Sequence, residues 1–397
     1  MPSEPSTSPN TEAPASTPSP TEIQAAARAR VESQLTASAL GTKKKRKATD
    51  DRDDDEPITL RWYGRNFVRN GCGPYERIHP IIEFGVKLEL IDPEDRPANP
   101  SAEDVRLAES WEILKALIPN FADDMVELGG DVKTRKHVAS QGGANGARGD
   151  DTGSFKGAAI DWALPLPPPA LPGEDPPPPE VISPPIPKAG KKVYLGQNHP
   201  VTARALRPIS FPDTQETYDK IKAGDEHFKI LGRQLPTFMF THSQVYDKED
   251  VEAGYLEGHM MRAAARHVYL GPSAALTGPD SSAGKAGNAA INGVRALTGR
   301  DITYLACQLR FALSSVESWH TMDGDFSYRE FYWKVVDSLR GDEGQAHLDR
   351  FNRDIFGTGA AAKQSAAATA HIPDEFELLQ QQRAAKRARA AEAAAAA

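Results

Sequence analysis

Apolar side chains recur at intervals of three and four residues over several segments of this chain, the spacing that places them on one face of an α-helix. The clearest stripe covers residues 302–313, and shorter stripes cover residues 107–118, 256–268, 331–339 and 348–355. No segment alternates convincingly between apolar and polar positions, as a half-buried β-strand would. The pattern therefore predicts a mainly all-α, irregular fold of short helices joined by Gly- and Pro-rich loops.

Polar residues and prolines mark the expected ends of these helices. Ser101 and Ser327 each precede an acidic residue by three positions, which is the spacing of a capping box at a helix N-terminus. Pro119 and the Gly-Pro pair at residues 271–272 follow two of the stripes and should end those helices. Residues 237–240 fit either a strand or a packed loop.

Composition divides the chain into one helical domain and three other segments. Residues 1–56 are rich in Pro, Ser, Thr and charge and hold almost no large apolar side chain, so we expect a disordered arm. Residues 164–192 form a proline-rich linker that interrupts the domain, which we place at residues 57–357. Residues 358–397 should form a further linker and an Ala-rich basic C-terminal helix.

The charge balance and the cysteine count narrow the possible functions. The formal net charge of −8 argues against a protein that binds nucleic acid over its whole surface, although it allows a local basic patch. Cys72 and Cys307 exclude a disulfide framework and have no metal-ligand spacing. No apolar stretch of about 18 residues is present, so we expect no membrane span. No catalytic motif is found either, and we expect no cofactor and no metal.

A compact basic run, Lys43-Lys44-Lys45-Arg46-Lys47, stands in the N-terminal arm. Five adjacent cations in an accessible segment suit the acidic groove of an import receptor, which predicts nuclear localisation. A solvated charge block that keeps the arm soluble is the alternative interpretation. A second basic cluster in the C-terminal helix is a weaker candidate for import or for contact with nucleic acid.

Residues 147–162 concentrate charge in front of a helical stripe. We expect Asp150 and Asp151 to cap a helix N-terminus, where their oxygens would accept hydrogen bonds from free backbone N–H groups. A site is the alternative: Arg148 and Lys156 could contact an anion, or the two carboxylates could bind a metal ion with further oxygen ligands.

Arginines are interleaved with aromatic residues near the start of the domain. In a helix, Arg61, Arg65 and Arg69 would share one face. Such a face could follow the phosphates of a nucleic acid. We favour the other interpretation, in which it is the solvent-exposed face of an amphipathic helix.

The histidines are scattered along the chain. His259 and His267 are eight positions apart and His199 stands alone in a polar turn. We therefore expect each to be a surface histidine or a hydrogen-bonded core histidine, not a metal ligand.

Several segments together resemble one family. They are the run Ala-Arg-Gly-Asp-Asp-Thr at 147–152 with Lys156, the pair Asp161-Trp162, residues 287–293, residues 308–315, the pair Phe331-Tyr332, and residues 351–356. In this order they resemble an uncharacterised family of domains of unknown function that is abundant in mushroom-forming fungi. The resemblance spans about residues 57–356. It carries over no catalytic residue, because none is established for that family.

Three classes of function stay open. We favour a non-enzymatic nuclear protein that acts as an interaction or nucleic-acid-associated factor, with an import receptor and nucleic acid or a chromatin protein as partners. The second class is an enzyme whose polar site gathers Arg148, Asp150, Asp151, Lys156, Asn288, Asn292, Arg295 and Arg310. The third is a purely structural protein-interaction module. A shared concave pocket around those polar residues would support the enzyme.

Overall fold

The structure is a computed structural model, described over residues 60–118, 120–127, 130–164, 180–186, 191–277, 287–291 and 294–357. These residues are mainly helical, as the sequence predicts. Their one sheet is an antiparallel pair, β1 (Met322–Asp323) and β2 (Phe326–Ser327), with Met322 opposite Ser327. The expected N-terminal arm, the C-terminal segment and most of the proline-rich linker lie outside the described residues.

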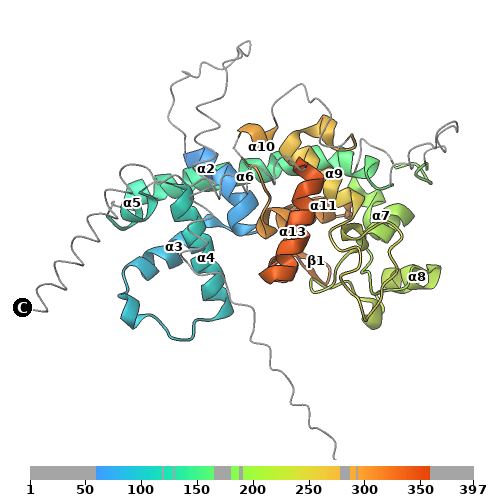
Figure 1. The fold of residues 1–397 in the computed structure, drawn as a ribbon, viewed down its shortest axis with the longest axis horizontal. Coiled ribbons are helices and arrows are strands. Elements are labelled where there is room, and N and C mark those ends of the chain that lie inside the picture. Colours follow the sequence, from blue (N-terminus) through green and yellow to red (C-terminus); the bar gives the residue numbers. More distant parts are fainter. Residues whose placement is uncertain are drawn as a thin grey trace, which may run out of the picture.

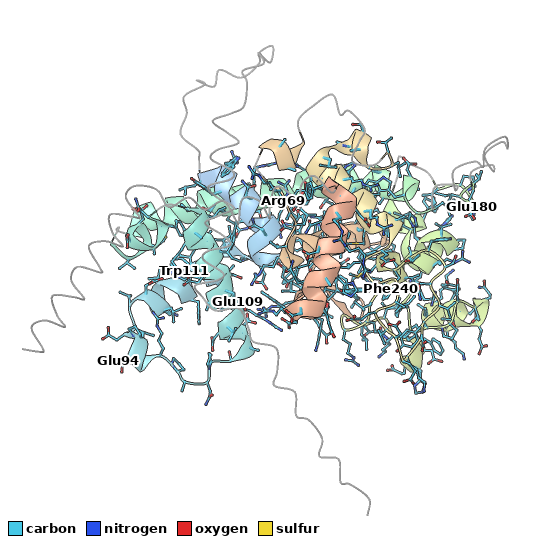
Figure 2. The ribbon with its side chains drawn as sticks, in the orientation of Figure 1. Arg69, Glu94, Glu109, Trp111, Glu180 and Phe240 are labelled. Carbon is cyan, nitrogen blue, oxygen red and sulfur yellow. The ribbon has the colours of Figure 1, made fainter. Side chains whose placement is uncertain are left out.

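The first group of helices encloses the smaller of two apolar cores (Figure 1). Its segments are α2 (Leu60–Phe67), a π-helical turn (Val68–Cys72), α3 (Ile78–Glu89), a 3-10 turn (Pro93–Asp95), α4 (Ala102–Leu117) and α5 (Phe121–Glu127). Helix α4 begins at the predicted capping box: Ser101 Oγ accepts from the backbone N–H of Asp104, whose side chain accepts from the backbone of Ser101. Trp111 is fully buried in this core (Figure 2). The apolar stripe of α4 therefore faces inward as predicted.

The second group of helices encloses the larger core around α11 (Gly299–Leu313). The other helices are α7 (Pro200–Leu206), α8 (Gln215–Ala223), α9 (His259–Ala265), α10 (Asn288–Ile291), α12 (Tyr328–Ser338) and α13 (Gly341–Phe356). Short 3-10 turns stand at Lys192–Tyr194, Gly196–Asn198, Glu226–Phe228, Thr237–Met239 and Pro272–Ala274, and α9 continues into a π-helical turn at Arg266–Leu270. Every residue from Arg300 to Leu313 is buried, so both faces of α11 are covered by other elements.

Two sequence-based expectations on local structure need adjustment. The stripe at residues 256–268 does not start a helix at Leu256, because Leu256 has φ +58 and the helix begins at His259. Residues 237–240 form neither a named strand nor an irregular loop but a 3-10 turn, after which Phe240 makes an isolated bridge to Tyr255. The bridge brings the end of this turn next to the residue that precedes Leu256.

Helix α6 (Gly130–Asp161) joins the two groups, and its 32 residues make it the longest helix of the described chain. It packs backbone to backbone against α2. A Cβ on Gly64 would stand 1.9 Å from the carbonyl oxygen of Ser140, and a Cβ on Gly143 would stand 1.9 Å from that of Arg61. Only glycine fits at either position.

Among the described residues, no helix combines the length and the apolar character that a membrane crossing requires.

This packing predicts opposite effects for two glycines of α6. Gly143→Ala should destabilise the protein by about 1 to 3 kcal/mol, because the added methyl group forces α2 and α6 apart. Gly149→Ala is the matched control: a Cβ there meets nothing within 4 Å, so the better helix propensity of alanine should stabilise the protein by about 0.5 to 1 kcal/mol. Urea unfolding of the full chain measures both changes, and equal stability of the two variants would contradict the packing.

Candidate functional site

Residues 147–161 lie inside α6, so the prediction that Asp150 and Asp151 cap a helix N-terminus is wrong. The helix continues through the glycine-rich residues before this segment although glycine is a poor helix former. The close contact with α2 explains this, because Gly143 allows the two backbones to approach. Tertiary packing thus overrides the local signal, and the two carboxylates are free to reach other helices.

Asp151 is buried and pairs with Arg69 of the π-helical turn after α2 (Figure 2). Arg69 Nε donates to Asp151 Oδ2 and its NH2 group donates to Oδ1, both at 2.9 Å. Tyr304 of α11 donates its hydroxyl to Asp151 Oδ2 at 2.7 Å. One carboxylate therefore joins three elements that are far apart in the sequence.

A chain of hydrogen bonds extends this network. Tyr304 Oη accepts from Gln308 Nε2 at 2.9 Å, and Gln308 Oε1 accepts from the hydroxyl of Thr152 at 2.9 Å. Thr152 in turn accepts from the indole N–H of Trp319 at 2.9 Å. Each donor in the chain meets an acceptor, which is the condition for a buried polar network to stabilise a fold.

The arginines of α2 do not form a solvent-exposed face, contrary to the interpretation favoured from the sequence. Arg61 is exposed, but Arg65 pairs with Asp150 at 2.7 Å and Arg69 is buried against Asp151. The face turns toward α6 because the glycine contact holds the two helices together. The pair of Arg69 with Asp151 is buried, whereas the pair of Arg65 with Asp150 is largely exposed.

The other predicted site residues have separate partners. Arg148 donates to the carbonyl of Pro74 and to Asn145, and Lys156 is exposed. Arg310 pairs with Asp323 of β1 at 2.5 Å and donates to the Tyr328 hydroxyl at 3.0 Å.

Asn288, Asn292 and Arg295 are the remaining three candidates. Asn288 donates to the carbonyl of Val268 at 2.7 Å, Arg295 is exposed, and Asn292 lies outside the described residues. Five of the candidates bind to different neighbours, namely Arg148, Asp150, Asp151, Asn288 and Arg310, and no described candidate lines the cavity described below.

A buried lysine that the sequence did not single out closes the C-terminal end of α11. Lys192 Nζ donates to the carbonyls of Phe311 and Val316 and lies over the Phe311 ring, 3.6 Å from its centroid. Burial lowers the pKa of Lys192 to about 7. Because the free carbonyls of a helix C-terminus attract a cation, this lysine acts as a cap.

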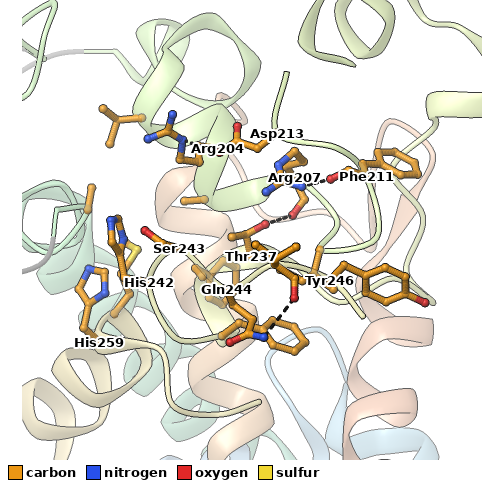
Figure 3. A pocket seen from close by; sticks show the side chains of 18 of the residues that line it. Arg204, Arg207, Phe211, Asp213, Thr237, His242, Ser243, Gln244, Tyr246 and His259 are labelled. Carbon is orange, nitrogen blue, oxygen red and sulfur yellow. Dashed lines mark hydrogen bonds and ion pairs between the residues drawn. The ribbon is translucent and has the colours of Figure 1, made fainter. Parts of the chain in front are cut away.

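The described chain contains a cavity of about 510 Å³ (Figure 3). Four segments line it: residues 163–164 just after α6, residues 201–213 on and after α7, residues 237–246, and the start of α9. Phe238, Phe240 and Met260 are buried and supply much of its apolar wall. The volume falls in the range of small-molecule sites.

A group of charged side chains lies along one wall of the cavity. Arg204 Nε pairs with Asp213 Oδ2 at 3.2 Å, and Tyr218 donates its hydroxyl to Asp213 Oδ1 at 2.6 Å. Arg207 donates through NH1 to the carbonyls of Phe211 and Pro208 (Figure 3). The wall therefore holds two guanidinium groups and one carboxylate.

Two histidines stand at another side of the cavity, with ring centroids 5.8 Å apart (Figure 3). His259 Nε2 lies 2.9 Å from the carbonyl oxygen of Trp162, so Nε2 must carry the proton of this hydrogen bond. Its Nδ1 is buried and has no partner among the described residues. Burial lowers the pKa of His259 to about 4, which leaves a neutral ring with an unshared electron pair. Neither histidine belongs to a group of three potential metal ligands within the described chain.

The expectation of a surface or hydrogen-bonded core histidine is confirmed for His199 and His259 but is wrong for His267, which is buried and whose two ring nitrogens have no hydrogen-bond partner among the described residues. His199 Nδ1 accepts from Val201 N and caps α7, while its Nε2 lies 2.7 Å from the carbonyl of Pro184. His267 packs between the rings of Phe155 and Trp162, and burial lowers its pKa.

The loop at residues 241–246 forms the outer rim of the cavity. Ser243 has φ +64, a left-handed backbone conformation that residues other than glycine rarely adopt. Val245 is 79% exposed and Tyr246 is also exposed, although both line the cavity. The rim thus presents apolar groups to solvent at the entrance.

Sequence reasoning did not find this cavity, because its walls come from four separated segments. From the sequence, residues 237–240 fit either a strand or a packed loop, and His259 fits either a surface histidine or a hydrogen-bonded core histidine. The local signals, His242-Ser243-Gln244 and the arginines of α7, match no motif. Only the folded chain shows that they face one space.

Residues 142–356 match the model of a family of unknown function, DUF6698, so the class of protein that this fold represents is a family with no assigned activity. The match covers more than half of the chain, and the chain belongs to this family. It contains all the motifs that carry the sequence resemblance but starts at residue 142, well after the start expected at residue 57. It also contains every residue that lines the cavity. No curated protein and no solved structure gives a significant match.

The buried network predicts that two adjacent carboxylates differ greatly in importance. Asp151→Asn keeps the shape of the side chain but leaves Arg69 buried without a counter-ion, which should cost about 3 to 5 kcal/mol of unfolding free energy. Asp150→Asn is the matched control, because its pair with Arg65 is largely exposed and should contribute about 1 kcal/mol or less. Denaturant unfolding of both variants measures the difference. A similar small loss in both would show that Asp151 does not hold the fold.

Proposed function

We propose that this chain is a nuclear protein that binds its partners without catalysing a reaction, and that the cavity beside α7 and α9 is its ligand-binding site. The cavity is the observation that carries the proposal. It combines an apolar wall with a few polar groups, which is the usual composition of a binding site. We also propose a fungal origin, because the sequence resembles a family that is abundant in mushroom-forming fungi.

The roles of the charged family-motif residues support binding over catalysis. Asp151 joins α6 to α11 and to the turn after α2, and Arg310 joins α11 to β1. These contacts account for the two side chains as parts of the fold. The enzyme hypothesis had assigned both of them to a common polar site.

The basic run at residues 43–47 supports the nuclear part of the proposal. The described fold begins at Leu60, so the run stands shortly before it in the sequence. The chain would first bind an import receptor that carries it into the nucleus. It would then bind a chromatin protein there. A nucleic acid is less favoured, because Asp150 pairs with Arg65 of α2 and Asp151 pairs with Arg69 of the turn after α2.

Binding in the cavity can be tested with a neutral aromatic probe. Phenylnaphthylamine, which fluoresces in apolar surroundings, should bind the full chain, and Val201→Trp should weaken binding by about tenfold or more because the indole fills the space. Val193→Trp is the matched control, since Val193 is exposed and does not line the cavity. Thermal unfolding confirms that both variants fold. Undiminished binding by Val201→Trp would place the probe elsewhere and contradict the proposal.

Nuclear import can be tested by replacing residues 43–47 with alanine. In cells, the chain fused to a fluorescent protein too large for passive passage should move from the nucleus to the cytoplasm, because the receptor groove loses its five cations. A matched variant removes the second basic cluster: Arg383, Lys386, Arg387 and Arg389. That variant should stay nuclear. A protein that stays nuclear without the first run would disprove this import signal.

A further inference from the structure

We propose that the cavity takes an amphipathic monoanion, with the single negative charge at the wall formed by Arg204 and Arg207 and an apolar body against Phe238, Phe240 and Met260. This inference rests on the proposed function, because it names the chemical class of ligand for the same cavity. It follows from the charge balance of one wall and from the composition of the other.

The charged wall carries an excess of one positive charge. Arg204 and Arg207 contribute two guanidinium groups and Asp213 contributes one carboxylate. Asp213 already pairs with Arg204 and accepts from Tyr218, so its negative charge is engaged. Among the described residues no carboxylate pairs with Arg207, whose hydrogen bonds go to the backbone carbonyls of Phe211 and Pro208.

The burial of Arg207 makes this excess charge effective. Arg207 is 4% exposed, and its Nε is buried without a partner in the described chain. A charge in a poorly hydrated wall is screened less by water and salt than a surface charge. A single anionic group at this wall would balance it, whereas a cation would add to the repulsion.

Arg204 offers the accessible contact for that group. Its side chain is 61% exposed and only its Nε is engaged with Asp213. The remaining N–H groups of a guanidinium form a planar fork that matches a carboxylate or a sulfonate. The anion would therefore lie on Arg204, within the field of Arg207.

The apolar wall selects the rest of the ligand. The cavity is lined by three buried apolar residues, Phe238, Phe240 and Met260, each of which is at most 4% exposed. Val201 and Ile209 add to this surface. An aromatic or aliphatic body placed here leaves water without displacing any charged group, which favours binding in proportion to the apolar area covered.

Two probes that differ by one sulfonate group test the proposal on the full chain. Anilinonaphthalene sulfonate is a monoanion, and phenylnaphthylamine is the same ring system without the charge. We expect the sulfonate to bind more tightly at physiological ionic strength. Arg204→Gln should weaken its binding about fivefold, and Asp213→Asn should strengthen it about threefold, because these changes remove and add one net positive charge at a partly exposed wall. Phenylnaphthylamine should be unaffected by either change.

Lys222→Gln is the matched control, since Lys222 is an exposed cation that does not line the cavity. Unchanged sulfonate binding in this variant shows that the effect does not come from total charge. If both probes bind equally well, or if Arg204→Gln weakens both alike, the anion preference is wrong while the cavity remains a binding site. If neither probe binds the wild-type chain, the proposed function fails together with this inference.

Discussion

The buried carboxylate of Asp151 is the interaction on which the arrangement of this protein depends. It accepts two hydrogen bonds from Arg69 and one from Tyr304, and these residues come from the turn after α2 and from α11. An ionised carboxylate is stable in an apolar interior only when its charge is paired and its oxygens accept hydrogen bonds. The positions of α2, α6 and α11 are therefore set together. Moving any one of them would leave a buried charge without its partner.

A second buried carboxylate repeats this arrangement at the other side of the first helical group. Glu109 of α4 accepts from Arg300 at the start of α11 at 2.8 Å and from Arg340 before α13 at 2.9 Å. Arg300 also donates to the carbonyl of Gly71. Arg300 and Tyr304, both in the first half of α11, thus bind buried carboxylates of α4 and α6. These buried ion pairs and hydrogen bonds connect the helices of the first group with α11 and with the turn before α13.

The sequence predicts the local structure well because local structure depends on nearby residues. The stripe at residues 302–313 and the Ser101 capping box need only three- and four-residue spacings, and both are confirmed. The conformation around Asp151 depends on Gly64 and Gly143, which are far apart in the chain and close in space. A carboxylate pair beside glycines has the local pattern of a helix start, and no short-range signal distinguishes it from a tertiary ion pair. The cavity escapes prediction for the same reason, since its four segments become neighbours only on folding.

Helix α6 connects the fold-holding network with the cavity. Asp151 and Thr152 lie in its middle and bind α11, while its last turn presents the backbone of Trp162 to His259 at the cavity wall. That hydrogen bond fixes the proton of His259 on Nε2 and directs the ring that faces His242. Helix α6 thereby helps to position one wall of the cavity, although no residue of the hydrogen-bond network lines the cavity. The residues of α6 that resemble the family bind α11, and the chain that follows them contributes to positioning the cavity wall.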